Sequence, residues 1–300
     1  MRGLLGRGAD AAVRAWVCHP FVRHLRLHFN VLLSPIYLWG VLLAGGRLGD
    51  ARVWLGYLAV HVFLYGGATA FNSYYDRDEG PVGGMLRPPG VTPGLLPFSL
   101  VVQAFGVPLA LVVGGRFVLT WTLLFLGFAA YSHPWVRLKA RLLGALSAIA
   151  LGQGALGFAL GWLAVAPAGG LATVAGLTGM ASAALVVLGL YVVTQSYQTL
   201  EDRRRGDRTL PVLLGPRRAL RVAVVFLAVG GAVMMAALAQ RAGVAWLVGV
   251  LAFFVGLGTW MLRWAARFDE RAVERNFRVA MGLAAVSSGG FTAVILALLA

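Results

Sequence analysis

The sequence predicts an all-α integral membrane protein, a bundle of nine transmembrane helices in a single domain over residues 1–300, with the N-terminus in the cytoplasm. Three observations support this fold class. Hydrophobic residues make up 59% of the 300 residues and charged residues only 12%, whereas soluble domains are about 25% charged. The apolar residues gather in long stretches, and the basic residues lie mostly on one side of them. A soluble enzyme is excluded, since it could not bury so much apolar surface.

The nine spans are identified by length. A helix needs about 20 mostly apolar residues to cross a bilayer. Nine segments meet this requirement, at 27–46, 53–75, 95–115, 117–135, 142–166, 171–197, 219–240, 243–264 and 279–299. Together they form a bundle over residues 27–299.

Two further segments are expected outside the spans. Residues 1–26 precede the first span, and within them residues 10–25 mix apolar and basic side chains, which favours a helix lying on the lipid headgroups. Residues 263–278 are rich in arginine and acidic residues and predict a solvated helical linker.

The distribution of the basic residues predicts the orientation. The chain has 26 Lys and Arg residues, and all but four lie in the N-terminal segment and the loops after spans 2, 4, 6 and 8. The other side holds Arg47, Arg52, Arg116 and Arg241. Because positive charges stay on the cytoplasmic side, the N-terminus is expected there. The net charge of +15 therefore calls for no nucleic-acid partner, and we expect a multi-pass protein of a bacterial or archaeal inner (plasma) membrane.

Six of the 11 acidic residues form two clusters at the ends of spans 2 and 6. The first cluster is Asp76, Asp78 and Glu79, and the second is Glu201, Asp202 and Asp207. An amide side chain precedes each cluster, Asn72 four residues before Asp76 and Gln198 four residues before Asp202. Residues four apart share one face of a helix, so each amide and acid form one oxygen-rich stripe.

Carboxylates close to the hydrocarbon region are costly and usually mark a functional site. Two stripes that face each other would supply the oxygen ligands that Mg²⁺ prefers, with phosphate oxygens completing its shell. The predicted metal ligands are Asn72, Asp76, Asp78, Glu79, Gln198, Glu201 and Asp202. The alternative is that these acids end the helices and pair with nearby arginines. Two matching clusters favour a shared metal site.

Three segments resemble the UbiA superfamily of intramembrane prenyltransferases. Residues 72–80 resemble the family motif N-D-x-x-D-x-x-x-D, with Asn72 and Asp76 matching and Ser73 and Gly80 replacing aspartates. Residues 198–215 resemble D-x-x-x-D-R-x-x-G-x-x-T-L-x-V-x-L-G, with Asp202 and seven later positions matching and Gln198 replacing the first aspartate. Residues 131–139 resemble the Y-S/T…R-x-K segment after the fourth helix.

The resemblance implies Mg²⁺-dependent transfer of a prenyl group from a polyprenyl diphosphate to a hydrophobic, often aromatic, acceptor inside the bilayer, with the site toward the cytoplasm. It implies catalytic roles for Asp76 and Asp202 as metal ligands. The diphosphate would be bound by Arg137, Lys139, Arg203 and Arg208. The acceptor or the prenyl chain would contact Arg26, His28, Asn30, Tyr75, Tyr131 and Tyr197.

Two other functions stay open at this point. A degenerate, non-catalytic homologue that binds a lipid is compatible with the aspartates that each motif lacks. A transporter or carrier is compatible with spans 2–4 and 6–8, which look like parallel repeats. A transporter would more often place its ionisable residues near the midplane of the membrane, whereas these acids lie at the ends of the spans.

Overall fold

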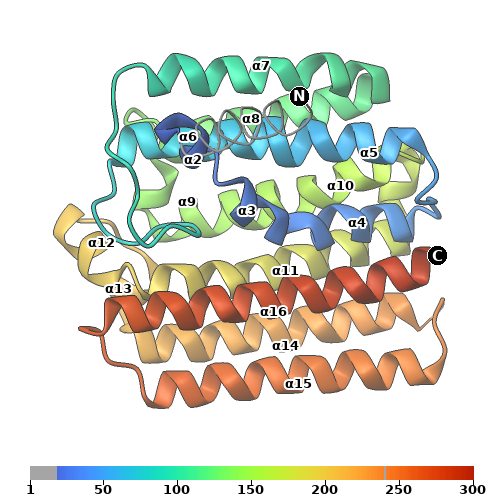
Figure 1. Cartoon of the computed structure of the whole chain (residues 1–300). Coiled ribbons are helices and arrows are strands. Elements are labelled where there is room, and N and C mark those ends of the chain that lie inside the picture. The colour runs from blue at the N-terminus through green and yellow to red at the C-terminus, as the bar shows by residue number, and fades with distance from the viewer. Residues whose placement is uncertain (1–18, 240) are drawn as a thin grey trace, which may run out of the picture.

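The computed structural model describes residues 19–239 and 241–300, and these residues form a helical bundle with its long helices side by side (Figure 1). Within the described residues, nine helices are long and apolar enough to cross a membrane. The predicted all-α bundle is therefore confirmed. The interfacial helix expected at 10–25 falls partly outside the described residues, and its described part contains α2 (Pro20–His24).

Four of the nine membrane helices are broken into shorter elements or are followed by short helices. The first comprises α2, α3 (Leu27–Asn30), η1 (Val31–Leu33) and α4 (Ser34–Leu43). The second comprises α5 (Ala51–Leu58), η2 (Ala59–Leu64) and α6 (Tyr65–Asp76), and the fifth comprises α9 (Leu142–Ser147), η4 (Ala148–Leu156) and α10 (Gly157–Leu163). The sixth is α11 (Val174–Ser196), which is followed by α12 (Thr199–Arg205) and α13 (Leu210–Leu214).

The remaining membrane helices are continuous. They are α7 (Leu95–Val113), α8 (Gly115–Ser132), α14 (Pro216–Leu238), α15 (Val244–Ala266) and α16 (Val273–Leu299). The solvated helical linker predicted at 263–278 is wrong, because α15 ends at Ala266 and α16 begins at Val273. Asp269 makes the turn between them: its Oδ1 accepts from the backbone N–H of Arg271 at 3.0 Å, and its carbonyl accepts from Asn276 Nδ2 at 2.7 Å.

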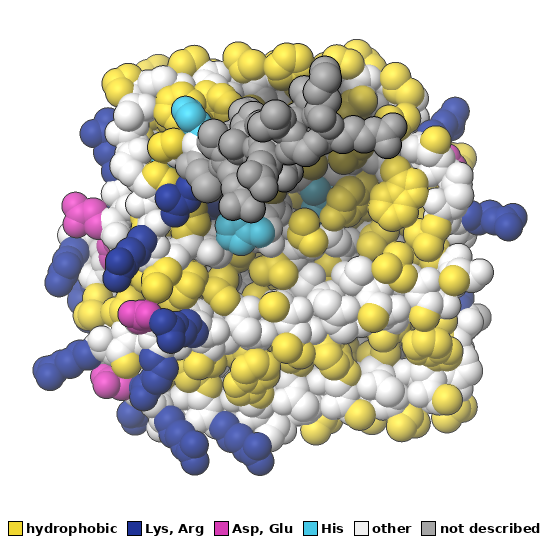
Figure 2. All heavy atoms as spheres, viewed as in Figure 1, with side chains coloured by type: hydrophobic (Ala, Val, Ile, Leu, Met, Phe, Trp, Pro, Cys, Tyr) yellow, Lys and Arg dark blue, Asp and Glu magenta, His cyan; other side chains and the backbone are white. Residues whose placement is uncertain are grey.

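The two ends of the bundle differ in charge. The loop after α6, together with α12 and α13, lies at one end, which we call the α12 end (Figure 1). Figure 2 shows most of the visible Lys and Arg side chains gathered at this end, whereas hydrophobic side chains cover the sides of the bundle. Exposed side chains such as Leu143 and Val244 would face lipid. The charge asymmetry seen in the sequence is therefore present in the folded chain.

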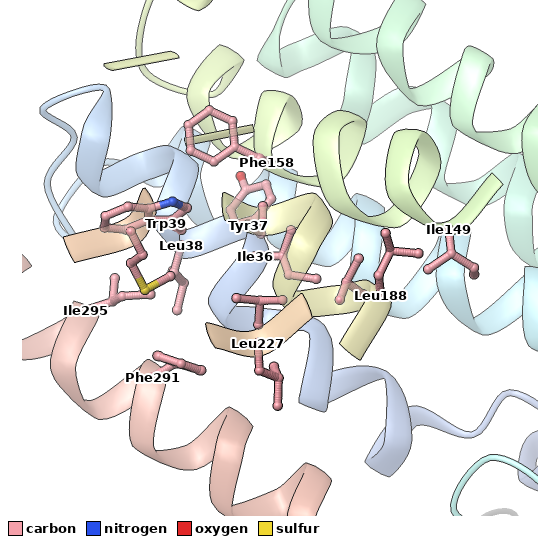
Figure 3. Packing of buried hydrophobic residues seen from close by; sticks show 14 of the residues in the cluster. Ile36, Tyr37, Leu38, Trp39, Ile149, Phe158, Leu188, Leu227, Phe291 and Ile295 are labelled. Carbon is pink, nitrogen blue, oxygen red and sulfur yellow. The ribbon is translucent and has the colours of Figure 1, made fainter. Parts of the chain in front are cut away.

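The core of the bundle surrounds α4. Side chains from α4, α10, α11, α14 and α16 meet there, including Trp39, Phe158, Leu188, Leu227 and Phe291 (Figure 3). Glycines bring α4 and α10 into close contact, since a Cβ on Gly161 would overlap the backbone carbonyl of Tyr37 and one on Gly40 would overlap that of Phe158. Small residues at such crossings allow backbones to approach in membrane proteins.

Within residues 19–239 and 241–300, three non-glycine residues adopt a left-handed backbone conformation, and all three lie next to short breaks toward the α12 end. They are Arg26 (φ 48°) between α2 and α3, Arg77 (φ 48°) after α6, and Arg137 (φ 41°) before η3 (Leu138–Ala140). Such conformations cost roughly 1–3 kcal/mol and cluster at functional sites. They turn the chain at the positions that deliver the polar side chains described next.

Candidate functional site

A cavity of about 260 Å³ lies inside the bundle, between helices that include α4, α6, α8, α11 and α16. Most of its wall is apolar, with Ile36, Trp39, Ile149, Val186 and Phe291 among its lining residues. At the α12 end the lining becomes strongly polar. We call this part the polar end of the cavity; its charged and amide residues are Arg26, Asn72, Asp76, Asp78, Lys139, Gln198, Asp202, Arg205 and Asp207.

The end of α6 supplies the first two acids of this polar end. Asp76 is the last residue of the helix and forms an ion pair with Lys139 of η3, and both side chains are less than a tenth exposed. The left-handed Arg77 then turns the chain. As a result Asp78 lines the cavity, whereas Glu79 is exposed.

The second acidic cluster reaches the same place from the other half of the chain. The main helix α11 ends at Ser196, and after a break Gln198 is the N-cap residue of the short helix α12. Gln198 Nε2 donates to the carbonyl of Pro81 at 3.2 Å, which ties α12 to the loop after α6. The carboxylate of Asp202 is buried and accepts a hydrogen bond from Thr209 Oγ1 at 3.2 Å.

Asp202 differs electrostatically from its neighbours. Burial raises the pKa of its carboxyl group to about 7, and this increase persists although the Thr209 hydrogen bond acts in the opposite direction. Among the described residues, no ion pair within 4.0 Å includes Asp202. A buried carboxylate without a cationic partner is a place where a cation would be stabilising.

Arg205 connects the two acidic clusters. Its Nη1 lies 2.6 Å from Asp78 Oδ1 and its Nη2 lies 2.5 Å from Glu201 Oε1. Burial alone would lower the pKa of Arg205, but the hydrogen bond and charge of Asp78 and the charge of Glu201 outweigh it and raise that pKa. Glu201 Oε1 also accepts from the backbone N–H of Glu79 at 3.3 Å.

Arg26 reaches the polar end from the break in the first membrane helix. Its Nη2 donates to Ser73 Oγ at 2.7 Å and lies 3.9 Å from Asp78 Oδ2. The Nε of Arg26 and the Oδ2 of Asp78 are buried and have no hydrogen-bond partner among the described residues. The site therefore has an unpaired donor on a cation, Arg26, and an unpaired acceptor on an anion, Asp78. Such groups suit a charged ligand.

The structure brings most of the predicted site residues together. Those that line one cavity are Arg26, Asn30, Asn72, Asp76, Asp78, Tyr131, Lys139, Tyr197, Gln198 and Asp202. Each motif contributes an amide and an aspartate, as the sequence predicts. What each of these residues does in the reaction stays a prediction.

The other predicted residues do not line the cavity. Glu201 forms an ion pair with Arg205, which does line the cavity. Arg137 forms an ion pair with Asp207 at 3.1 Å. Arg203 pairs instead with Glu270 at 2.9 Å on a half-exposed surface. Tyr75 packs beside Phe71, Tyr74 and His133, because it lies about 100° around α6 from Asp76. Glu79, His28 and Arg208 are exposed.

Several cavity residues were not predicted from the sequence. Arg205, Asp207 and Thr209 line the polar end. Deeper in, the hydroxyl groups of Tyr131 and Tyr191 lie 3.0 Å apart, and Gln195 Nε2 donates to Tyr191 at 2.6 Å. The i,i+4 spacing of Glu201 and Arg205 is the one signal in the sequence that could have indicated their ion pair, since such pairs form on one face of a helix.

The oxygen atoms at the polar end of the cavity suit a hard divalent cation, although in this conformation Asp76 and Asp78 form ion pairs with Lys139 and Arg205. Over residues 19–239 and 241–300, no three His, Cys, Asp or Glu side chains lie close enough together to hold a metal ion. The cavity nevertheless presents amide and carboxylate oxygens from two helix ends, and Asp202 is buried without an ion pair. Oxygen ligands of this kind suit Mg²⁺.

Comparisons with known proteins agree with this architecture. The UbiA prenyltransferase family matches residues 33–286 of the chain. A search of curated proteins gives no match. Among solved structures, a UbiA homolog from Archaeoglobus fulgidus bound to GPP and Mg²⁺ is similar with a TM-score of 0.64 and 18% identity, over 93% of this chain and 99% of that one.

Two further structures share the fold. The same homolog bound to DMAPP and Mg²⁺ has a TM-score of 0.60 and 18% identity, over 91% of this chain and 98% of that one. A structure described as digeranylgeranylglyceryl phosphate synthase has a TM-score of 0.62 and 12% identity, over 93% and 98%. The family match, the nine apolar helices and the shared fold lead to one conclusion: the chain is an integral multi-pass membrane protein of the UbiA prenyltransferase family.

Proposed function

We propose that the chain transfers a prenyl group from a polyprenyl diphosphate to a hydrophobic, often aromatic, acceptor within the membrane, with Mg²⁺ as its cofactor. One observation carries the proposal. A single cavity joins a polar end, built from both acidic clusters, to an apolar interior between the helices. The substrate that fits such a cavity has an anionic head and a hydrocarbon tail.

The apolar part of the cavity suits the hydrocarbon tail. Along α11 the lining residues run from Ala183 to Gln195, a distance of about 18 Å at the rise of an α-helix. An apolar cavity of this kind would also keep water away from a reactive intermediate. By the positive-inside rule the polar end faces the cytoplasm of a bacterial or archaeal cell.

Cationic side chains at the polar end suit the anionic head. Lys139 and Arg205 line the cavity there, and Arg137 lies beside it through Asp207. Asn72, Asp76, Gln198 and Asp202 are the residues that would hold Mg²⁺. The bound ion would neutralise charge on the diphosphate and make it a better leaving group.

The transfer balances with no further reactant. The bond between the allylic carbon and the diphosphate oxygen breaks, and its electron pair leaves with the diphosphate. An electron pair on an acceptor carbon or oxygen then forms a new bond to the allylic cation, and the proton that the acceptor loses passes to the released diphosphate. Tyr131 and Tyr197 line the cavity and would stabilise the cation through their ring faces.

The experiment uses the purified protein in nanodiscs with geranylgeranyl, farnesyl and geranyl diphosphates, Mg²⁺ and a panel of aromatic and lipid acceptors. We expect Mg²⁺-dependent release of diphosphate together with a prenylated product in the mass spectrum. The control is the Asp76→Asn, Asp202→Asn double variant, which should release at least 100-fold less diphosphate. Tight binding of a prenyl lipid with no release for any donor would favour a non-catalytic lipid-binding protein. Movement of a substrate across vesicle membranes without chemistry would favour a carrier.

A further inference from the structure

An arginine occupies the position between the two acidic clusters where a metal ion was expected. Asp78 and Glu201 were predicted as metal ligands, one from each cluster. In the structure Arg205 bonds to both, at 2.6 Å and 2.5 Å. It thereby joins the loop after α6 to α12, as a divalent cation bound to both carboxylates would.

Arg205 has donors to spare for a ligand. The guanidinium group carries five N–H donors in a fixed fork, and the two ion pairs engage Nη1 and Nη2. Its side chain is 23% exposed and lines the cavity. Phosphate oxygens are preferred partners of such a fork. The guanidinium group is therefore held by two acids and still accessible to an anion in the cavity.

Arg26 reinforces the positive charge on the same acid. It lies 3.9 Å from Asp78, while its Nη2 donates to Ser73, the residue that stands where the first acidic motif has an aspartate. Its Nε is buried without a partner among the described residues. A second metal ion at Asp78 would have to displace two arginines from this acid.

The Asp202 side of the polar end is different. Asp202 is buried, and none of the ion pairs of the described chain involves it. The amide residues Asn72 and Gln198 line the same part of the cavity. This side retains oxygen ligands for a divalent cation, whereas the Asp78 side is already neutralised.

We propose that Arg205 is a built-in substitute for one divalent cation, so that the chain binds a prenyl diphosphate with Arg205 and a single divalent ion held at Asp202. The inference rests on the proposed function and adds to it that one arginine and one metal ion share the binding of the diphosphate. It follows that part of the affinity for the diphosphate is independent of metal. It also follows that removal of Arg205 frees Asp78 and Glu201 to bind a second ion.

The test counts bound metal rather than turnover. The full-length protein in nanodiscs is saturated with a non-hydrolysable thiolo analogue of geranylgeranyl diphosphate and titrated with Mn²⁺, and bound Mn²⁺ is counted by electron paramagnetic resonance. Affinity for the analogue is measured separately in EDTA. The variants are Arg205→Gln and Arg205→Lys, and the matched control is Arg204→Gln, an exposed neighbour on the same helix. Thermal melting checks that each variant is folded.

We expect one Mn²⁺ per protein in the wild type and in Arg204→Gln, and two in Arg205→Gln. In EDTA we expect the wild type to bind the analogue, Arg205→Gln to lose at least 10-fold in affinity, and Arg205→Lys to lose less because it keeps the charge without the fork. Two Mn²⁺ ions in the wild type, or equal affinities of wild type and Arg205→Gln in EDTA, would overturn the inference while leaving prenyl transfer intact. No binding of the analogue with or without Mn²⁺ would overturn the proposed function itself.

Discussion

Asp76, the last residue of α6, forms a buried ion pair with Lys139 in the segment between α8 and α9. The pair holds a predicted metal ligand and a predicted diphosphate ligand against each other. Binding of Mg²⁺ to Asp76 and of diphosphate to Lys139 would separate them and give each a new partner of opposite charge. Binding of Mg²⁺ and diphosphate would therefore replace the Asp76–Lys139 ion pair with two new ion pairs, so that no buried charge lacks a partner.

Replacement of Asp76 by asparagine should damage both stability and activity. The change removes a proposed metal ligand and leaves Lys139 as a buried cation without its partner, which costs on the order of 3–5 kcal/mol. We expect diphosphate release to fall at least 100-fold and Tm to fall clearly in the metal-free protein. The Asp76→Asn, Lys139→Met double variant is the control and should regain most of the Tm but none of the activity. Recovery of turnover in that double variant would remove Asp76 from the mechanism.

Replacement of Asp202 by asparagine should damage activity alone. In the folded protein burial raises the pKa of Asp202 to about 7, above its ordinary value. Folding therefore disfavours the ionised form, and this carboxyl costs stability as pH rises from about 4 through about 7. In EDTA at pH 8 we expect the Tm of Asp202→Asn to equal or exceed that of the wild type, while its turnover falls at least 100-fold. A Tm loss as large as that of Asp76→Asn would contradict the absence of an ion pair at Asp202.

The length of the apolar cavity should set donor preference. Ala183 is buried on α11 and lines the cavity far from the acids. Phenylalanine at this position would fill part of the space for the chain. We expect Ala183→Phe to raise KM for geranylgeranyl diphosphate at least 10-fold and to change KM for geranyl diphosphate little. The matched control is Ala181→Phe on the exposed face of the same helix. An equal increase in KM for both donors would mean that the chain does not extend along α11.

The contact between α4 and α10 should depend on Gly161. A Cβ there would meet the backbone of Tyr37, and backbone cannot move aside as a flexible side chain can. We expect Gly161→Ala to destabilise the bundle by about 1–3 kcal/mol, the usual cost of overpacking, measured by thermal melting in detergent. Gly256→Ala on α15 is the matched control, because a Cβ there has nothing within 4 Å. If both variants melt alike, the close approach of α4 and α10 contributes little.

The bundle was predictable because each membrane helix carries its own signal in length and hydropathy. Asp76 and Asp202 were predictable as neighbours because each lies four residues after an amide at the end of a membrane helix. The role of Arg205 was not predictable among three consecutive arginines. Which of them enters the cavity depends on how α12 is turned after the break at Tyr197 and Gln198, and the bond from Gln198 to Pro81 fixes that turn.

The linker at 263–278 shows the limit of reading a helix from composition. Its charges suit a solvated helix, but Asp269 accepts hydrogen bonds from three residues that follow it, Arg271, Ala272 and Asn276, and makes a turn instead. Local hydrogen bonds to aspartate compete with the helix in this way.

Tyr75 lies next to Asp76 in sequence yet does not line the cavity, because adjacent residues on a helix point in different directions.

We propose that both acidic clusters form one diphosphate site that uses Mg²⁺. Calorimetric binding of geranylgeranyl diphosphate to the purified protein tests this, in Mg²⁺ and in EDTA, with the Asp76→Asn, Asp202→Asn double variant beside the wild type. We predict that Mg²⁺ strengthens binding at least 10-fold in the wild type and has no effect in the double variant. Equal strengthening by Mg²⁺ in both proteins, or no binding of the diphosphate by the wild type in either condition, would contradict the claim.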